Sequence, residues 1–151
     1  MEKIYKVGVI GCGGISHMHT SWYQAEPRTE VTVISDIDAD RLQAYGEQYG
    51  IEKAYTDYIE MLETEDLDIV SVCTRPKFHA PLVIESAKRG VRGILSEKPM
   101  AENLGQAREM VDVSQGNNVK LAIGHQLRFN SPYVLAKELI ENGEIGEIFR
   151  V

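Results

Sequence analysis

The sequence is poor in cysteine and has no long hydrophobic run. Cys12 and Cys73 are its only two cysteines, too few for the disulfide framework of a small secreted domain. No apolar stretch approaches the roughly 20 residues that a membrane-spanning helix needs. The first residues also lack the apolar core and cleavage site of a secretory signal peptide. These absences favour a reduced, cytoplasmic protein without a membrane segment.

Basic residues are also scarce relative to acidic ones. The chain has 16 lysines and arginines against 23 aspartates and glutamates, and its formal net charge is −7. Binding to the phosphate backbone of nucleic acid needs a concentrated basic face, so we expect no nucleic-acid partner. Hydrophobic residues make up 43% of the 151 residues, which is enough for the core of one domain of ordinary size.

Short apolar runs alternate with segments of helical periodicity along the chain. Strands are expected over 5–10, 31–35, 52–55, 67–73, 91–96 and 119–124, and helices are expected to begin near residues 15, 38, 57, 79, 103 and 131. This alternation predicts βαβ units, and hence a doubly wound parallel sheet of the Rossmann type in a three-layer α/β/α arrangement. A last apolar run, 147–151, predicts one more strand, which we interpret as the beginning of another domain.

Helical spacing also predicts which side chains face the sheet. For the first helix, the apolar residues at this spacing are Ile15, Met18, Trp22 and Ala25. For the helix that begins at Asn103, they are Leu104, Ala107 and Met110.

The first predicted strand runs into a glycine-rich loop. Gly11, Gly13 and Ser16 occupy the three small-residue positions of the dinucleotide fingerprint G-x-G-x-x-G, with Gly14 and Ile15 beside them. The first glycine permits a tight turn, and the second lets a pyrophosphate approach the backbone. The helix that follows offers free N–H groups to the phosphates. We therefore predict a dinucleotide site here, with a ligand-free glycine turn as the alternative.

An acid stands where the fingerprint requires one. Asp36 follows the second predicted strand, in the position of the carboxylate that binds the adenosine ribose. Its charge would repel a 2′-phosphate, so NAD is favoured over NADP as the cofactor. Arg41, one helical turn further on, could instead pair with a phosphate, but we favour a solvated surface arginine.

The cysteine and histidines near this loop predict no metal site. His17 and His19 are too close in sequence to share a helix face, although either could lie near the phosphates. Cys12, between the glycines, is interpreted as a small side chain in a tight loop rather than a catalytic thiol.

A Glu-Lys-Pro sequence follows the fifth predicted strand at once, within ILSEKPM at 94–100. Ligands of open α/β sheets bind beyond the carboxyl ends of the strands, and Lys98 lies at such an end. A lysine beside a nicotinamide could move a hydroxyl proton while the cofactor takes hydride. The alternative is an ordinary surface lysine. Sequence alone leaves open whether the bond before Pro99 is cis or trans.

Several segments together resemble one protein family. GCGGISHMH, SDID, CTRPKFHAPLVIESAKRG, ILSEKP and GHQLRFNSPYVLAKELIENGEIGEI are similar, in this order, to segments of the glucose–fructose oxidoreductase / inositol dehydrogenase / rhizopine-catabolism (Gfo/Idh/MocA) family. The resemblance implies an NAD(P)-binding Rossmann domain at 1–125. It also implies a connecting helix at 126–151 that leads into a C-terminal α/β domain absent from this chain.

The resemblance further implies an oxidoreductase. Members transfer hydride between a nicotinamide cofactor and a hydroxyl or carbonyl of a sugar, cyclitol or similar small molecule, and a homo-oligomer is expected for the full-length protein. The Asp/His pair that usually completes the catalytic site belongs to the C-terminal domain, so we expect this chain to bind cofactor without efficient turnover. A nucleotide-sensing regulator and a fragment of an NAD-dependent glycosidase stay open as alternatives.

The resemblance also assigns residues. Beyond the glycine loop and Asp36, it places the following residues in the cofactor site: Thr74, Pro76, His79, Glu97, Lys98 and Gln126. Lys98 is expected to reach the reacting hydroxyl as the catalytic residue. A role for Arg128 near cofactor or substrate rests on a weaker match. For His79, a cap at the start of its helix is the alternative, and for His125 a position in the core or in solvent is favoured over catalysis.

Overall fold

The computed structural model describes residues 3–150. The elements follow in the order β1 (Tyr5–Ile10), α1 (Gly14–Ala25), β2 (Thr29–Ser35), α2 (Ala39–Tyr49), β3 (Lys53–Tyr55), α3 (Tyr58–Thr64), β4 (Ile69–Val72), η1 (Pro76–Phe78), α4 (His79–Lys88), β5 (Gly93–Ser96), α5 (Leu104–Gly116), β6 (Lys120–Ile123), η2 (Gln126–Phe129) and α6 (Ser131–Glu141). Within residues 3–150, none of these helices is long and apolar enough to cross a membrane.

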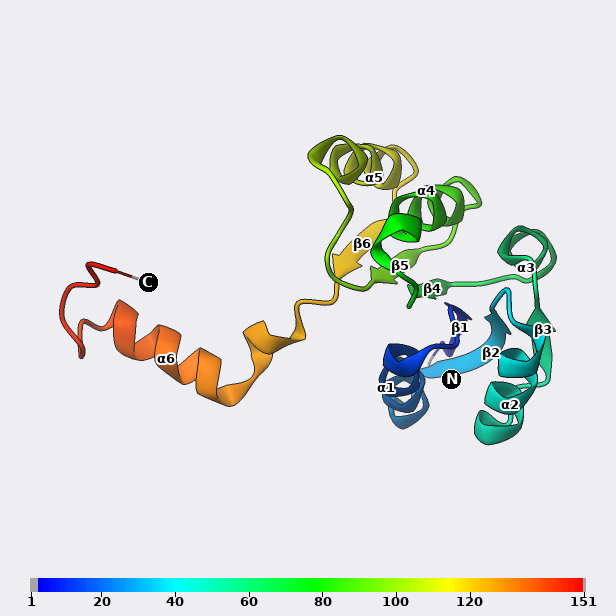
Figure 1. Ribbon diagram of the computed structural model, residues 1–151, viewed down its shortest axis with the longest axis horizontal. Helices are drawn as coiled ribbons and strands as arrows, with labels where there is room; N and C mark the ends of the chain where they lie inside the picture. The colour runs from blue at the N-terminus through cyan, green and yellow to red at the C-terminus, as the bar shows by residue number, and fades with distance from the viewer. Residues whose placement is uncertain (1–2, 151) are drawn as a thin grey trace.

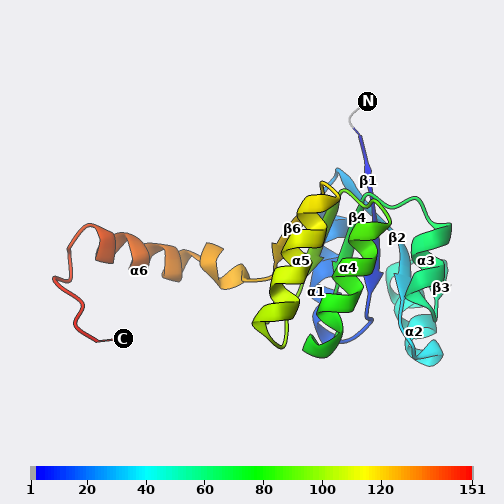
Figure 2. The ribbon, with the colours of Figure 1, turned by 90° about the horizontal axis from the view of Figure 1, so that it is seen from above.

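The six strands form one parallel sheet in the order β3-β2-β1-β4-β5-β6. This is the strand order of the Rossmann fold, and it confirms the predicted doubly wound α/β class. Helices α1 and α2 cover one face of the sheet, and α3, α4 and α5 cover the other, so the sheet is the middle of three layers (Figures 1 and 2).

A hydrophobic cluster on each face of the sheet holds the layers together. Val7 and Val9 of β1 pack with Leu42 and Tyr45 of α2, whereas Ile10 belongs to the cluster under α3, α4 and α5. Side chains of a strand alternate between faces, and here both faces are covered. The central strands are therefore apolar at consecutive positions rather than at every second one.

Local capping residues set the ends of α2 and the beginning of α3. The Asp38 carboxylate accepts a hydrogen bond from the backbone N–H of Arg41 at 3.0 Å, and Gly50 ends α2 with a φ of 68°. Asp57 begins α3 in the same way, accepting from the N–H of Ile59 at 2.8 Å. The predicted starts of both helices are thereby confirmed.

The predicted buried faces of α1 and α5 need correction. Helix α1 buries Ser16, His19 and Thr20, while Trp22 is 52% exposed, so its buried stripe is shifted from the apolar one. In α5, Met110 is buried but Leu104 is 66% exposed. Each residue turns a helix by about 100°, so residues six positions apart point about 120° away from each other. In α5, the predicted steps of three residues therefore move away from the stripe that is buried.

The segment after β6 differs from the prediction. The strand expected over 147–151 is not formed at 147–150, which are irregular and exposed, and Val151 lies outside the described residues. A strand needs a partner backbone, and α6 projects away from the three layers, with η2 as its neighbour (Figures 1 and 2). Apolar side chains are exposed along this projection, among them Leu127, Phe129, Tyr133, Leu135, Ile145 and Phe149.

The correction to α5 is testable by two substitutions. Met110→Ala removes a fully buried side chain, and we expect it to lower the free energy of unfolding by about 2–5 kcal/mol. Leu104→Ala, in the same helix but exposed, is expected to change it by less than about 0.5 kcal/mol. Urea denaturation followed by circular dichroism measures both values. Equal losses in the two variants would contradict the assignment of the buried face.

Candidate functional site

A groove with a volume of about 1010 Å³ opens at the carboxyl ends of β1, β2 and β4. The chain leaves β1 toward the face covered by α1, and it leaves β4 toward the opposite face (Figure 1). Ligands of doubly wound sheets bind at such a point, where the direction of winding changes. The predicted site residues that line the groove are Gly11, Gly13, Gly14, Asp36 and Thr74.

The glycine loop forms the floor of the groove. Gly11 has a φ of 95°, and a Cβ there would lie 2.7 Å from the carbonyl oxygen of Cys73, so glycine is required. A Cβ at Gly13 or Gly14 would meet nothing within 4 Å, which leaves these backbones open to a ligand. Ser16 is fully buried and donates to the carbonyl oxygen of Gly13 at 2.5 Å, so it closes the turn from behind.

Asp36 lies at the end of β2 with its carboxylate held by the backbone. Its Oδ2 accepts the N–H of Cys12 at 2.8 Å, and its Oδ1 accepts the N–H of Asp38 at 3.0 Å. Each carboxylate oxygen can accept more than one hydrogen bond, so capacity remains for a ligand hydroxyl. Arg41 is half-exposed, as expected for a surface arginine, yet it also lines the groove with its guanidinium 3.4 Å from Oδ2 of Asp36.

Both cysteines line the groove as buried thiols. Burial is the main cause that raises the pKa of each thiol to about 12, and the neighbouring carboxylates add to it: Asp36 at Cys12, and Glu97 at Cys73. A thiol needs to ionise before it becomes a nucleophile. The geometry therefore agrees with the interpretation of Cys12 as a structural side chain.

Glu97 follows β5 with its carboxylate turned inward, beneath the surface. The residue is only 4% exposed. Its Oε1 lies 3.0 Å from Nε2 of His19, and its Oε2 accepts the backbone N–H of Lys98 at 3.2 Å. On the β6 side the space is closed by Gly124, where a Cβ would lie 2.7 Å from Oε1 of Glu97. Glu97 thus supports the Glu-Lys-Pro turn from below and does not line the groove.

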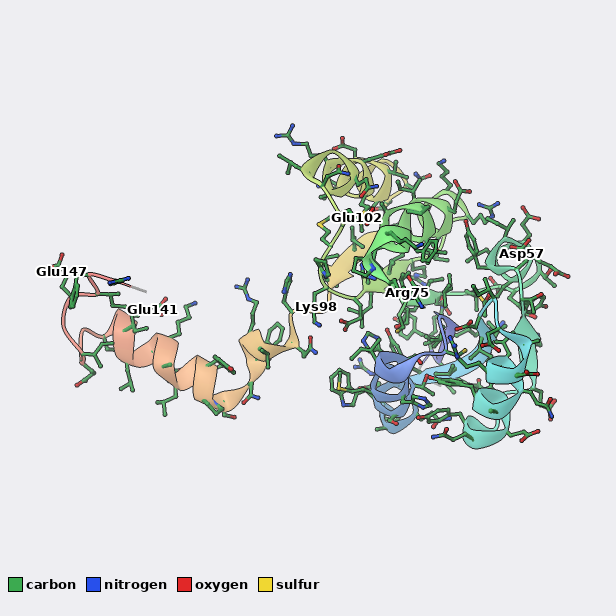
Figure 3. The ribbon with its side chains drawn as sticks, viewed as in Figure 1. Asp57, Arg75, Lys98, Glu102, Glu141 and Glu147 are labelled. Carbon is green, nitrogen blue, oxygen red and sulfur yellow. The ribbon has the colours of Figure 1, made fainter. Side chains whose placement is uncertain are left out.

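Lys98 is exposed at the end of β5. Figure 3 shows it at the border between the α/β layers and the segment that leads to α6. The Lys98–Pro99 peptide bond is cis, which answers the question that the sequence left open. Lys98 does not line the groove but lies beyond it along the same edge of the sheet.

His79, the first residue of α4, joins two loops from within the protein. Its Nδ1 lies 2.8 Å from the carbonyl oxygen of Pro99, and its Nε2 lies 3.0 Å from that of Thr74. The side chain is fully buried, and it makes no hydrogen bond that caps α4. His79 therefore lies behind the groove wall, between the loop after β4 and the turn after Lys98.

Most of the remaining predicted residues lie outside the groove. Ile15 packs into the cluster under α1 and α2, Pro76 is exposed in η1, and Gln126 begins η2. His125 and Arg128 are exposed. His17 lines the groove, with Nδ1 at 2.9 Å from the hydroxyl of Tyr49. Within residues 3–150, no three His, Cys, Asp or Glu side chains gather as metal ligands.

Sequence reasoning missed part of the groove wall. The missed residues are Ile10, Ser35, Ile37, Thr56, Tyr58, Cys73, Arg75, Lys77, Phe78, Pro81 and Leu82. The sequence offered one signal, because Ile37 is an apolar residue directly after the acid predicted to bind the ribose. In the structure, Ile37 is 90% exposed. The role of His19 beside Glu97 left no local signal, since the two residues are far apart in the chain.

The chain is similar to known oxidoreductases along most of its length. Residues 5–125 match the model of a family described as "Oxidoreductase family, NAD-binding Rossmann fold". The myo-inositol 2-dehydrogenase of Thermotoga maritima is 35% identical over 94% of this chain and 42% of its own length. The D-apiose dehydrogenase of Paraburkholderia graminis is 33% identical over 97% of this chain and 39% of its own length.

Solved structures of oxidoreductases are also similar to this chain. The WlbA dehydrogenase of Bordetella pertussis, in complex with NADH and UDP-GlcNAcA, superimposes with a TM-score of 0.91 at 30% identity, over 97% of this chain and 45% of that one. An oxidoreductase of Agrobacterium radiobacter, in complex with NAD+, L-tartaric acid and magnesium, has a TM-score of 0.87 at 29% identity, over 95% and 42% of the two chains. The chain thus spans less than half the length of each relative.

The requirement for glycine at position 11 can be tested by substitution. We expect Gly11→Ala to lower the free energy of unfolding by about 1–3 kcal/mol, because the positive φ and the carbonyl of Cys73 both oppose a side chain. Gly14→Ala is the matched control, with open space at its Cβ and an expected change below about 0.5 kcal/mol. Urea denaturation decides between them, and a Gly11→Ala variant as stable as the control would refute the account.

Proposed function

The chain belongs to the Gfo/Idh/MocA oxidoreductase family, whose NAD-binding domain has the Rossmann fold, and we propose that its groove binds NAD for a dehydrogenase. The proposed substrate is a sugar, cyclitol or similar small molecule with a reacting hydroxyl or carbonyl. The observation that carries the proposal is the groove itself, where an open glycine loop lies beside the carboxylate of Asp36, next to the switch point of the sheet.

The groove fits the pyrophosphate and the adenosine ribose of the cofactor in different ways. The open backbones of Gly13 and Gly14 and the beginning of α1 provide N–H groups for the pyrophosphate. Asp36 retains capacity for the hydroxyls of the adenosine ribose, and its negative charge opposes a 2′-phosphate. Arg41 is engaged by Asp36 and Asp38, at 3.4 Å and 3.2 Å, which reduces its attraction for that phosphate. Both features favour NAD over NADP.

Lys98 is the proposed catalytic residue. NAD, when bound, supplies a carbon that accepts or returns hydride. The loop with Thr74 borders the end of the groove toward β5, and Lys98 lies further along this edge with an exposed side chain. Its amine can hold the proton that a substrate hydroxyl gives up when its carbon loses hydride. A lysine placed for proton transfer favours a dehydrogenase over a nucleotide-sensing regulator.

The activity of a whole protein that contains this chain is also part of the proposal. The chain spans about 42% of the length of the myo-inositol 2-dehydrogenase that it matches. We propose that 1–125 form the dinucleotide-binding domain and that 126–151 connect it to a substrate-binding part, without which turnover is inefficient. We also propose a cytoplasmic homo-oligomer, and the two free, buried cysteines support a reducing compartment.

Cofactor choice can be measured by calorimetric titration of the chain. We expect NAD to bind at least about tenfold more tightly than NADP. We expect Asp36→Asn to weaken NAD binding by roughly tenfold, because the negative charge and one of the two acceptor oxygens are lost. Asp40→Asn, an exposed acid in the first turn of α2, is the control and is expected to bind as the parent does. Tighter binding of NADP than of NAD to the parent chain would refute this interpretation of Asp36.

Catalysis is tested in a protein that includes the rest of the polypeptide. Lys98→Met is expected to lower kcat by about 10²–10⁴-fold through loss of proton transfer, while NAD affinity stays within a few-fold of the parent. Lys88→Met removes an exposed lysine of α4 that pairs with Glu85 at 3.0 Å, and it should leave kcat unchanged. Undiminished turnover in the Lys98 variant would exclude Lys98 as the proton carrier.

A further inference from the structure

A buried carboxylate lies directly beneath the proposed catalytic lysine. A buried charge is costly unless hydrogen-bond donors surround it. Among the described residues, the Glu97 carboxylate has two hydrogen-bond partners, His19 at Oε1 and the backbone N–H of Lys98 at Oε2. The donor of the second hydrogen bond, the N–H of Lys98, belongs to the Glu-Lys-Pro turn itself. The first comes from α1, which covers the face of the sheet opposite to α4 and α5.

The orientation of His19 is set on every side. The side chain is 2% exposed, and its Nδ1 lies 2.8 Å from Oγ of Ser71 in β4. The ring stacks near Trp22, with 6.1 Å between ring centroids. An ionised carboxylate only accepts hydrogen bonds, so Nε2 of His19 carries the hydrogen. The Ser71 hydroxyl can donate to or accept from Nδ1, so it holds the second ring nitrogen in place.

We propose that His19 is a positioning residue, which holds the Glu97 carboxylate and through it the backbone of Lys98. The connection runs from α1, whose beginning borders the groove, to Glu97 and then to the amide of Lys98. His19 itself does not line the groove. This inference rests on the proposed function in one respect, because that function makes Lys98 the catalytic residue.

Two substitutions of His19 separate its two hydrogen bonds. The amide nitrogen of Gln in His19→Gln reaches about as far as Nε2 and retains a donor for Glu97. The shorter amide of Asn in His19→Asn reaches only the place of Nδ1, so it retains the Ser71 contact and loses the Glu97 contact. The readout is the hydrogen-exchange rate of the Lys98 backbone amide, followed by NMR on the ¹⁵N-labelled chain without cofactor or substrate.

We expect the Lys98 amide to exchange roughly tenfold faster in His19→Asn than in the parent, and at close to the parent rate in His19→Gln. Thr20→Val is the matched control, because it removes a buried hydrogen bond of the next residue in α1, the one between the hydroxyls of Thr20 and Tyr45 at 2.7 Å. This control is expected to lower stability without a selective change at Lys98. The amides of Ile94 and Leu95 in β5 report general loosening.

Three results would overturn the proposal. These are an unchanged Lys98 amide in His19→Asn, an equal acceleration at Lys98, Ile94 and Leu95, or an identical effect in the Gln and Asn variants. The exchange measurement is made without cofactor, so it does not depend on whether the chain binds NAD. A failure of the proposed function is therefore distinguished from a failure of the role proposed for His19. In a protein with the rest of the polypeptide, His19→Asn should lower kcat at unchanged NAD affinity, and His19→Gln should restore it.

Discussion

The parallel pairing of β1 with β4 is the constraint on which the site depends. The two strands are in register from Val7 opposite Ile69 to Ile10 opposite Val72, and the N–H of Cys73 continues the ladder by donating to the carbonyl of Ile10 at 2.8 Å. This pairing brings the carbonyl of Cys73 against Gly11 and leaves no room for a side chain there. The helices that follow the two strands then diverge to opposite faces, and the groove is the space between them.

A second set of contacts holds the far end of the same edge. His79 lies between the carbonyls of Thr74 and Pro99, and the Glu97 carboxylate lies between His19 and the amide of Lys98. The loop after β4 therefore has two neighbours that are fixed to it, the glycine loop on one side and the Glu-Lys-Pro turn on the other. Cofactor groove and proposed proton carrier are parts of one connected edge, although Lys98 lies outside the groove.

The fold and the glycine loop could be predicted because their signals are local. Alternating strands and helices, the caps at Asp38 and Asp57, and the short spacing of Gly11 and Gly13 are each read within a few residues. The buried faces of the helices were predicted less well. In α1, the spacing of apolar residues does not reveal that polar residues such as His19 are buried. The pairing of His19 with Glu97 could not be predicted from either segment, since only tertiary packing brings α1 and the end of β5 together.

Gly124 carries a consequence for how this edge can evolve or be redesigned. The carboxylate of Glu97 occupies the volume that any side chain at position 124 would need. The residues at positions 97 and 124 therefore depend on each other. A larger residue at position 124 requires a shorter or relocated acid at position 97. We expect relatives with a side chain at the equivalent of position 124 to differ at the acid as well. Libraries that diversify the end of β6 are best built with both codons varied together.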